Sequence, residues 1–346
     1  MEQRYKEIFN SLKERDEIRN KNSRVLIVDG TNTFIRCWSA MPNMNDQGEH
    51  VGGVVGTLQS IGVAIRKIDP TRVIVVFDGK DGSYRRRRAF GDYKANREGK
   101  NPFRPNRQYE GLVSEDEERA SMKKQFVWLN DFLNYLPITT MIYDGIEADD
   151  VIAYVSTQLV KEDEESVIMS VDRDFLQLID ENTKVWNPVQ KKLIDKEMLE
   201  EDWGIPSENF LLYRTLNGDN IDNIPGVSGL GLKTLKTRIP EIMEGKLDYD
   251  TLYQLCEERR GKIKIFDNIL EAKDRLKLNH ELMQLSDPDI PTQLKLKIMD
   301  RYGEKIQPVS KLEFMKIMLK YQVTNNFGLN VNDWLNKTFS RLITDK

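Results

Sequence analysis

The chain has 346 residues, 39% of them apolar and 31% charged, which is enough for a substantial core and predicts about two domains. Its two cysteines and two histidines argue against a disulfide framework, a zinc site or a histidine-centred triad. The net charge of −4 argues against a uniformly basic nucleic-acid binder, and no apolar run suits a membrane span or a secretory signal, so we expect a cytoplasmic protein.

Residues 1–23 carry apolar side chains at helical spacing and predict an amphipathic N-terminal extension. The run RVLIVD at 24–29 then predicts a buried strand that ends at Asp29, and a helical pattern follows at 54–67. The run TRVIVVFD predicts a second strand, which ends at Asp78. Continuous apolar runs of this kind suit strands that are buried on both faces of a parallel sheet.

The segment from Lys80 to Arg107 is strongly basic, with ten Lys or Arg residues against three Asp or Glu. Aromatic residues lie among these cations, Tyr93 being one of them. A charge run is usually a solvated face, but this density inside an acidic chain favours contact with nucleic acid. The aromatic rings then have two interpretations, which are stacking on bases of a frayed strand and packing within the protein.

A helical pattern at 123–135 leads to the stretch PITTMIYDGIEADD, which predicts a short strand, a loop and the start of a helix at 149–161. The run SVIMSVDRD predicts another strand, which ends at Asp172. This alternation of strands and helices indicates a doubly wound, mostly parallel α/β sheet. The functional crevice of such a sheet lies beyond the carboxyl ends of the strands, where these aspartates fall.

Three further carboxylates, Glu147, Asp149 and Asp150, stand within four residues of one another. The helix dipole favours acidic residues in a first helical turn, which accounts for only part of this triplet. Two carboxylates about 4 Å apart repel by roughly 4 kcal/mol at an effective dielectric near 20. A site built from several of them therefore needs cations, and oxygen ligands without His or Cys favour Mg²⁺ or Mn²⁺.

The stretch NGDNIDNIPGVSGLGLKTL holds two more acids, Asp219 and Asp222, before a glycine-rich turn. We do not expect a P-loop, because Leu232 separates Gly231 from Lys233 and the segment with Pro225 before the glycines is expected to be helical rather than a strand. The glycines instead predict a hairpin between two helices. The backbone amides of such a hairpin, together with Lys233, can bind duplex phosphates without reading bases.

Two amphipathic patterns near the C-terminus, at 311–322 and 331–343, predict helices. We expect them to pack onto the second domain. Docking of a replication protein is the alternative interpretation of their apolar faces.

The ordered series VDG, FDGK, RRRR, YKANR, IEADD, SVDRDF and GDNIDNIPGVSGLGLKT resembles the 5′-nuclease, or flap endonuclease, superfamily over residues 24–291. Within it, SYRRRRAFGDYKANR and VWNPVQKK resemble the T-even bacteriophage branch with its ribonuclease H enzymes. The resemblance implies a PIN-like nuclease core over 24–205 with a helical arch at about 80–125. It also implies a helical region over 206–346 with a helix-hairpin-helix element at 219–240.

The resemblance further implies roles for individual residues. The metal-binding carboxylates would be Asp29, Asp78, Glu147, Asp149, Asp150, Asp172, Asp174, Asp219 and Asp222. The catalytic set would be Asp78 and Asp172 with two residues that contact the scissile phosphate, Lys94 and Arg97. The nucleic-acid-binding residues would be Arg85, Arg86, Arg87, Arg88, Tyr93, Lys94, Arg97, Gly226, Gly229, Gly231, Lys233 and Thr234.

The implied cofactors are two Mg²⁺ or Mn²⁺ ions, with a K⁺ ion at the hairpin. The implied activity is 5′–3′ exonuclease and flap endonuclease cleavage with ribonuclease H activity, which removes RNA primers in phage DNA replication. The expected partners are DNA and RNA–DNA duplexes with a free 5′ end or flap, and a phage single-stranded-DNA-binding protein or sliding clamp. The resemblance implies a monomer in the cytoplasm of an infected bacterium.

Other classes fit the residues less well. A haloacid-dehalogenase-type phosphatase needs a second Asp two residues after the first, but Thr31 stands there after Asp29. A single-strand ribonuclease of the related small-nuclease fold explains the acids but not the glycine hairpin. The main alternative is a structure-specific DNA-binding module of the same fold with a weak site, although none of the expected carboxylates is missing.

Overall fold

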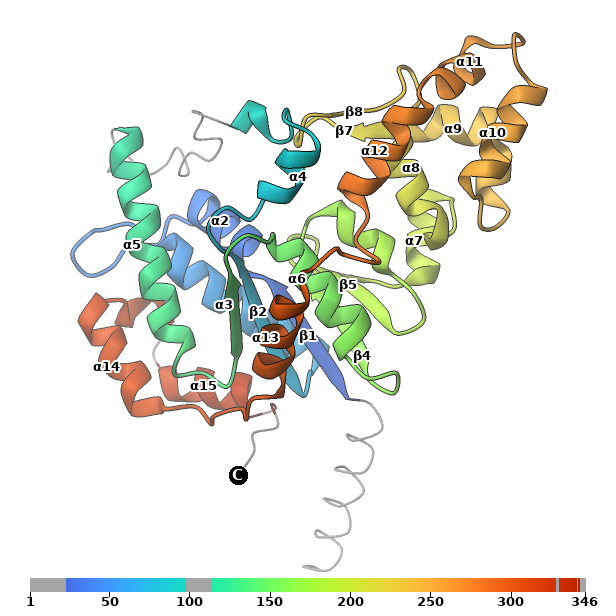
Figure 1. Cartoon of the computed structure of the whole chain (residues 1–346). Coiled ribbons are helices and arrows are strands. Elements are labelled where there is room, and N and C mark those ends of the chain that lie inside the picture. The colour runs from blue at the N-terminus through green and yellow to red at the C-terminus, as the bar shows by residue number, and fades with distance from the viewer. Residues whose placement is uncertain (1–22, 98–113, 328–329, 341, 343–346) are drawn as a thin grey trace, which may run out of the picture.

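A computed structural model describes residues 23–97, 114–327, 330–340 and 342 (Figure 1). Its centre is a six-stranded sheet with the order β3-β2-β1-β4-β5-β6. The strands are β1 (Arg24–Asp29), β2 (Arg72–Asp78), β3 (Thr139–Tyr143), β4 (Glu165–Met169), β5 (Thr183–Asn187) and β6 (Lys192–Ile194). All neighbours pair in parallel except β6, which is antiparallel to β5. The doubly wound, mostly parallel fold is confirmed.

Successive side chains of the central strands are buried on alternate faces of the sheet, and both faces are covered. In β1, Val25 and Ile27 belong to one apolar cluster, while Leu26 and Val28 belong to the other. The second face is covered by α2 (Gly30–Ala40), α3 (Gly52–Ile68) and α5 (Glu115–Leu133). The first face is covered by α6 (Ala148–Tyr154) and the π-helical turn η2 (Val155–Leu159).

Two helices differ from the sequence patterns at their ends. The helix predicted at 123–135 begins earlier, because Ser114 and Glu117 form a reciprocal capping box at the start of α5. The helix predicted at 149–161 changes pitch after Tyr154, where the amide of Val160 donates to the carbonyl of Val155 at 3.0 Å. Helix ends depend on such capping contacts, which apolar periodicity does not report.

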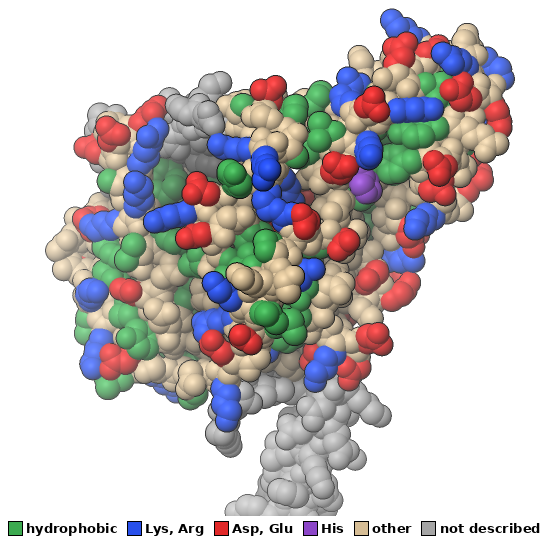
Figure 2. Space-filling view, viewed as in Figure 1, with side chains coloured by type: hydrophobic (Ala, Val, Ile, Leu, Met, Phe, Trp, Pro, Cys, Tyr) green, Lys and Arg blue, Asp and Glu red, His purple; other side chains and the backbone are tan. Residues whose placement is uncertain are grey.

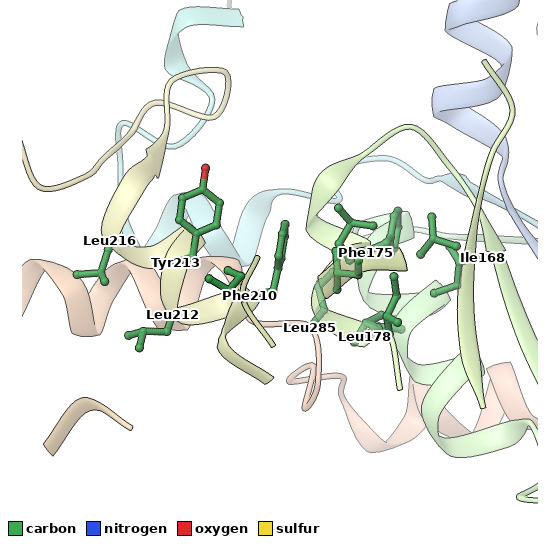
Figure 3. Packing of buried hydrophobic residues seen from close by; sticks show 14 of the residues in the cluster. Ile168, Phe175, Leu178, Phe210, Leu212, Tyr213, Leu216 and Leu285 are labelled. Carbon is green, nitrogen blue, oxygen red and sulfur yellow. The ribbon is translucent and has the colours of Figure 1, made fainter. Parts of the chain in front are cut away.

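A second, mainly helical region extends from the sheet. Its helices are α7 (Lys196–Trp203), α8 (Phe210–Asn217), α9 (Leu232–Arg238), α10 (Tyr249–Glu258), α11 (Lys264–Glu271) and α12 (Lys273–Met283). Phe175 and Leu178 of the short helix η3 (Arg173–Leu178) lie between Ile168 of β4 and Phe210 of α8 (Figure 3). The apolar core is therefore continuous from the sheet into the helical region.

The C-terminal helices do not pack where the sequence analysis placed them. They are α13 (Thr292–Gly303), α14 (Lys311–Tyr321) and α15 (Val331–Phe339). Helix α14 contacts α5 and α15 contacts α3, so both lie against the α/β layer (Figure 1). The Phe314 ring lies 5.0 Å from that of Phe132. For the two predicted helices, α14 and α15, the expected packing onto the second domain is wrong, because their apolar faces complete the core beside α3 and α5. Helix α13 was not predicted, and its Ile298 belongs to the cluster on the other face of the sheet.

The described helices include none with the length and apolar character needed to span a bilayer. The predicted N-terminal extension up to residue 22 and the part of the predicted arch at 98–113 lie outside the described residues.

Candidate active site

The predicted acidic residues lie at the carboxyl edge of the sheet. Asp29 is the last residue of β1 and Asp78 the last of the adjacent strand β2. Asp172 follows β4, which pairs with the other side of β1. The chain first winds from β1 towards β3 and then returns to β4 beside β1. The acids therefore stand at the switch point where open α/β sheets hold their functional crevice.

Ser170 links two of these acids. Its hydroxyl donates to Asp29 Oδ2 at 2.9 Å, and the amide of Asp172 donates to the Ser170 Oγ at 3.0 Å. Asp29 also caps α2, because its Oδ1 accepts from the amide of Asn32 at 3.0 Å. Only 4% of Asp29 is exposed. The sequence analysis did not single out Ser170, whose position directly after a buried strand was the available signal.

Asp78 connects the end of β2 to the acidic triplet. Its Oδ1 accepts from the amide of Ala148 at 2.8 Å, which caps the first turn of α6. Its own amide donates to the hydroxyl of Thr31 at 2.8 Å. Unlike Asp29, Asp78 is exposed to solvent. The carboxylate thus fixes where α6 starts while its second oxygen stays available to a ligand.

Glu147 and Asp150 face one guanidinium. Arg86, on the short helix α4 (Tyr84–Ala89), donates from Nη2 to Asp150 Oδ1 at 2.7 Å and from Nη1 to Glu147. Its Nε donates to the carbonyl of Leu282 at 2.8 Å. The two acids lie three residues apart and share one side, as their spacing predicts. These contacts leave only 13% of the Arg86 side chain exposed, although the sequence analysis counted it among the nucleic-acid-binding residues.

Lys94 and Tyr93 lie beside the same acid. The Lys94 ammonium pairs with Glu147 and stands 3.8 Å from Asp222 Oδ2. The Tyr93 hydroxyl lies 3.3 Å from both Glu147 Oε2 and Asp222 Oδ2. The Tyr93 ring is only 4% exposed, so in this structure it is placed for packing rather than for stacking on a base. In this structure the ammonium of Lys94 is thus engaged with acidic side chains of the site.

Arg214 is a functional candidate that the sequence analysis missed. From α8, its Nε donates to Asp174 Oδ1 at 2.8 Å and its Nη2 to Asp219 Oδ2 at 2.5 Å. It is 8% exposed. Asp174 follows the sheet, whereas Asp219 belongs to the helical region, so this arginine joins the two parts of the predicted acidic site. Little in the sequence indicated this role, because a single arginine in a helical pattern usually lies on the solvent-exposed face.

The carboxylates differ in charge balance. Burial, with repulsion from Asp78 and Asp172, raises the pKa of Asp29 to about 7, although the hydrogen bonds that Asp29 accepts lower it. Burial and Asp172 likewise raise the pKa of Asp174 to about 7, although Arg214 opposes them. Burial, Asp172 and Asp29 raise the pKa of Asp149. Carboxylates that repel each other in this way need protons or cations to share one site.

Glu147 behaves in the opposite way. Burial alone would raise its pKa, but Lys94 and Arg86 outweigh burial and hold the pKa below its ordinary value. Burial also opposes the charge on Lys94, yet Glu147 and Asp222 keep the pKa of Lys94 above its ordinary value. This side of the site is therefore a compensated ion network.

The donor set suits a hard divalent cation. It consists of carboxylates, and the sheet-edge members repel one another without full compensation. Within the described part of the chain, no three His, Cys, Asp or Glu side chains are arranged to hold one ion together. Arg86, Lys94 and Arg214 meanwhile occupy oxygens of the acids around the edge. The chemistry of the donors fits the predicted metal. The carboxylates that now pair with these basic side chains would have to reorient before they could bind it.

The other predicted basic residues lie around α4. Figure 2 shows Lys and Arg side chains gathered there, between the sheet and the helical region. Arg85 pairs with Asp289, while Arg87 and Arg88 are exposed. The side chain of Arg97 lies outside the described residues, although its backbone ends the short helix η1 (Ala95–Arg97).

The glycine-rich stretch forms a turn between α8 and α9. A small antiparallel ribbon, β7 (Gly218–Asp219) and β8 (Ile224–Pro225), follows α8. A side chain at Gly226 would clash, since a Cβ there would lie 2.1 Å from the carbonyl oxygen of Asn217. Gly229 has φ +76°, in the left-handed region that favours glycine. Gly231 then caps α9, on which Lys233 is exposed and Thr234 is half-buried.

Known proteins resemble this chain in sequence and in fold. The family described as "5′-3′ exonuclease, N-terminal resolvase-like domain" matches residues 24–204. A 5′-3′ exonuclease of Buchnera aphidicola is 30% identical over 294 residues, which cover 82% of this chain and 94% of the relative. The thermostable DNA polymerase I of Thermus aquaticus is 32% identical over 273 residues, 78% of this chain. The matched part spans only 29% of that polymerase.

A crystal structure of bacteriophage T5 flap endonuclease in a complex with DNA and metal ions shares the fold. The TM-score is 0.58 at 21% identity, and the match covers 87% of this chain and all of the other. The family match takes in the strand ends that carry Asp29 and Asp78 and the residues after β4 that include Asp172. The chain belongs to the 5′–3′ exonuclease family of nucleases.

Proposed function

We propose that the chain is a divalent-metal-dependent 5′–3′ exonuclease and flap endonuclease with ribonuclease H activity on RNA annealed to DNA. One observation carries the proposal: mutually repelling carboxylates, with Asp29 buried among them, stand at the edge of the sheet and face a basic segment. Asp29 and Asp149 lie on the acidic side, and Arg86 and Lys94 on the basic side. A phosphodiester needs both, namely oxygen ligands for cations and positive charge for its own oxygens.

The sheet-edge acids Asp29, Asp78, Asp149, Asp172 and Asp174 are the residues proposed to hold Mg²⁺ or Mn²⁺. When bound, two such ions supply Lewis-acid activation of water and neutralise charge on a phosphodiester. Ser170 keeps two of the acids in register by its hydrogen bonds to the Asp29 carboxylate and the Asp172 amide. Fixed ligands of this kind bind a cation without first having to order their side chains.

Lys94 is proposed to contact the scissile phosphate, together with Arg97 three residues later. The ammonium is poised for this role because Glu147 and Asp222 hold it charged at the edge of the acidic group. Exchange of Glu147 for phosphate oxygens would place the charge where negative charge grows in the transition state. The Glu147 carboxylate released by that exchange would still be neutralised by Arg86.

The proposed substrates are DNA and RNA–DNA duplexes with a free 5′ end or flap. The exposed Lys233 and the turn at 226–234 would hold duplex backbone, and the segment around α4 would receive the 5′ strand. The resemblance to the T-even branch supports removal of RNA primers in phage replication, by a monomer in the bacterial cytoplasm. A single-stranded-DNA-binding protein or sliding clamp as partner, and K⁺ at the turn, stay predictions.

The alternative is a catalytically weak, structure-specific DNA-binding module of the same fold. Such a module tolerates loss of carboxylates, whereas here the sheet-edge acids are present and Ser170 organises two of them. The intact set favours the enzyme.

The test uses one duplex with a 5′ flap, in free form and with streptavidin bound to the 5′ tip. With Mg²⁺, the free flap should release short products with 5′ phosphates, and blocking the tip before enzyme addition should strongly suppress cutting. A duplex without a flap, but with an annealed RNA primer, should also be shortened from its 5′ end. Equal rates on free and blocked flaps, or mononucleotides released from the 3′ end, would contradict the proposed polarity.

A further inference from the structure

Two segments far apart in the chain meet beside Lys94. Residues 92–96 and the ribbon turn 220–223 are joined by hydrogen bonds that involve main-chain atoms on one or both sides. The Lys94 amide donates to the carbonyl of Asp222 at 3.0 Å. The side-chain amide of Asn223 donates to the carbonyl of Asp92 at 2.9 Å, and that of Asn96 to the carbonyl of Asn220 at 3.0 Å. We call these two segments the clasp.

The turn side of the clasp is internally fixed. Asp219 Oδ1 accepts from the amides of Ile221 and Asp222 at 2.6 and 3.2 Å, which folds the turn over the end of β7. Asn223 has φ +61°, a left-handed conformation that Asn tolerates better than most residues. Strand β8 starts at the next residue, so the position of the Asn223 side chain is set by the ribbon.

The other side of the clasp holds a lysine in an unfavourable backbone conformation. Lys94 has φ +57°, which costs energy for a side chain of this kind. Such a conformation persists only where surrounding contacts hold it. Here the amide of Lys94 is held by Asp222, and the carbonyl two residues earlier is held by Asn223. The direction of the Lys94 side chain towards Glu147 therefore depends on contacts from the helical region.

We propose that Asn223 is a positioning residue for Lys94: it holds the backbone at Asp92 so that the ammonium is presented at the edge of the acidic site. This inference rests on the proposed role of Lys94 at the scissile phosphate. The side chain of Asn223 donates to the main-chain carbonyl of Asp92, so the proposed effect on Lys94 is exerted through the backbone of 92–96.

The clasp also ties Lys94 to the predicted duplex-binding turn. Strand β8 contains only Ile224 and Pro225, and Gly226 follows directly. Gly226 lies so close to the carbonyl of Asn217 that a Cβ there would come within 2.1 Å of its oxygen. A displacement of the glycine-rich turn is thus passed to Asn223 through two residues of paired strand. Duplex binding at the turn and placement of Lys94 would in this way be coupled.

The test variant is Asn223→Gly. It removes the hydrogen bond to Asp92, while glycine keeps the left-handed backbone of the turn. The matched control is Asn182→Gly, since the Asn182 side chain also donates to a main-chain carbonyl, that of Glu162, at 3.4 Å before β5. Asn223→Gly should lower kcat on the 5′-flap duplex roughly three- to tenfold, with the dissociation constant changed by less than about twofold. Asn182→Gly should change neither quantity.

A double-mutant cycle shows whether Asn223 acts through Lys94. In the Lys94→Ala background, Asn223→Gly should have no further effect on kcat. The same loss in both backgrounds, or a loss confined to the dissociation constant, would overturn the proposal.

Hydrogen exchange supplies a measurement that needs no activity. The amide of Lys94 should exchange faster in Asn223→Gly than in the parent chain, and unchanged exchange would overturn the positioning contact. If Lys94→Ala cleaved the flap duplex at the wild-type rate, the proposed role of Lys94 would be overturned. The hydrogen-exchange result would still decide whether Asn223 holds the backbone of Lys94.

Discussion

The acidic site has two sides whose carboxylates are held in opposite ways. At the sheet edge, Asp29 accepts from a backbone amide and a hydroxyl, and burial raises its pKa to about 7. On the side of α4, Glu147 is buried to a similar degree, yet Lys94 and Arg86 more than offset that burial and its pKa is lowered. Burial alone therefore does not decide the charge of these groups.

The difference indicates a division of work. The side that already has its cations is a structural network, in which Arg86 ties α4 to the acids at the start of α6. The side that lacks full compensation is the one with free energy to gain from a bound ion. Apart from Lys94, whose proposed role is catalytic, changes on the first side should mainly affect stability, whereas changes on the second should mainly affect catalysis and metal binding.

The largest effect is expected at the sheet edge. Asp78→Asn or Asp172→Asn should lower cleavage by at least about 10³-fold, because each removes negative charge from the proposed metal site. Asparagine keeps an oxygen that can still accept from Ala148 or Asp174, so folding and duplex binding should be largely retained. Cleavage in chelator should stop and return with Mg²⁺ or Mn²⁺. Full activity of both variants would show that the sheet-edge acids are not the metal-binding side of the site.

Arg86→Ala tests the compensated side. It leaves Glu147 and Asp150 buried without their guanidinium, and loss of one partner of such a network typically costs about 3–5 kcal/mol. Urea unfolding should show this loss. Arg88→Ala, on the same helix but exposed, is the matched control and should stay within about 0.5 kcal/mol of the parent. Equal stability of the two variants would show that the network is not structural.

The pH dependence of stability should differ between metal-free and metal-loaded protein. The pKa of Asp29 rises from 3.8 to about 7 on folding, so between these values the folded state binds more protons and stability falls as pH rises. Asp174 adds to the same trend. Glu147, with its lowered pKa, acts in the opposite direction and only at acidic pH, where its stabilising ion pairs are lost by protonation.

In chelator, the free energy of unfolding should therefore drop by roughly 1–3 kcal/mol from pH 5 to pH 7. Mg²⁺ should reduce this drop, because it binds the deprotonated carboxylates. Asp29→Asn should flatten the curve in chelator. A rise of stability with pH over that range would contradict the assignment of Asp29 and Asp174 to the uncompensated side.

The smallest effect is expected away from both sides, at the predicted duplex-binding turn. Lys233→Ala should weaken binding similarly for all duplex sequences and reduce the slope of log affinity against log salt by about one unit. Lys305→Ala is the control. Lys305 is exposed and follows α13, and Arg301 of α13 donates to the carbonyl of Thr140 in the edge strand β3, away from the glycine-rich turn. An unchanged slope for Lys233→Ala would place the duplex elsewhere.

The fold and the acidic edge were largely predictable. Continuous apolar runs ending at Asp29 and Asp78 predict adjacent buried strands, and the geometry of parallel sheets then brings the acids together. These are local patterns whose consequence is fixed by chain topology. The spacing of Glu147 and Asp150 similarly predicted a common side, because helical periodicity sets it.

The partners of the acids were not predictable in the same way. Arg86 is one of four consecutive arginines, and nothing in RRRR distinguishes the one that turns inwards to Glu147 from the exposed Arg88. Arg214 pairs with Asp174 across 40 positions of the chain, a contact that depends on how α8 docks against the sheet. Long-range docking also decided the location of α14 and α15, which amphipathic periodicity describes only as having an apolar face.

The return of α14 and α15 to the α/β layer has a consequence for synthesis of the protein. Phe314 and Phe339 share an apolar cluster with Leu26 and Val28, so one core is completed by residues from both ends of the described chain. A nascent chain emerging from the ribosome holds the β1 side of that core long before α15 has been translated. The nuclease layer therefore cannot reach its full packing during elongation, and final consolidation waits until the last helices have left the exit tunnel.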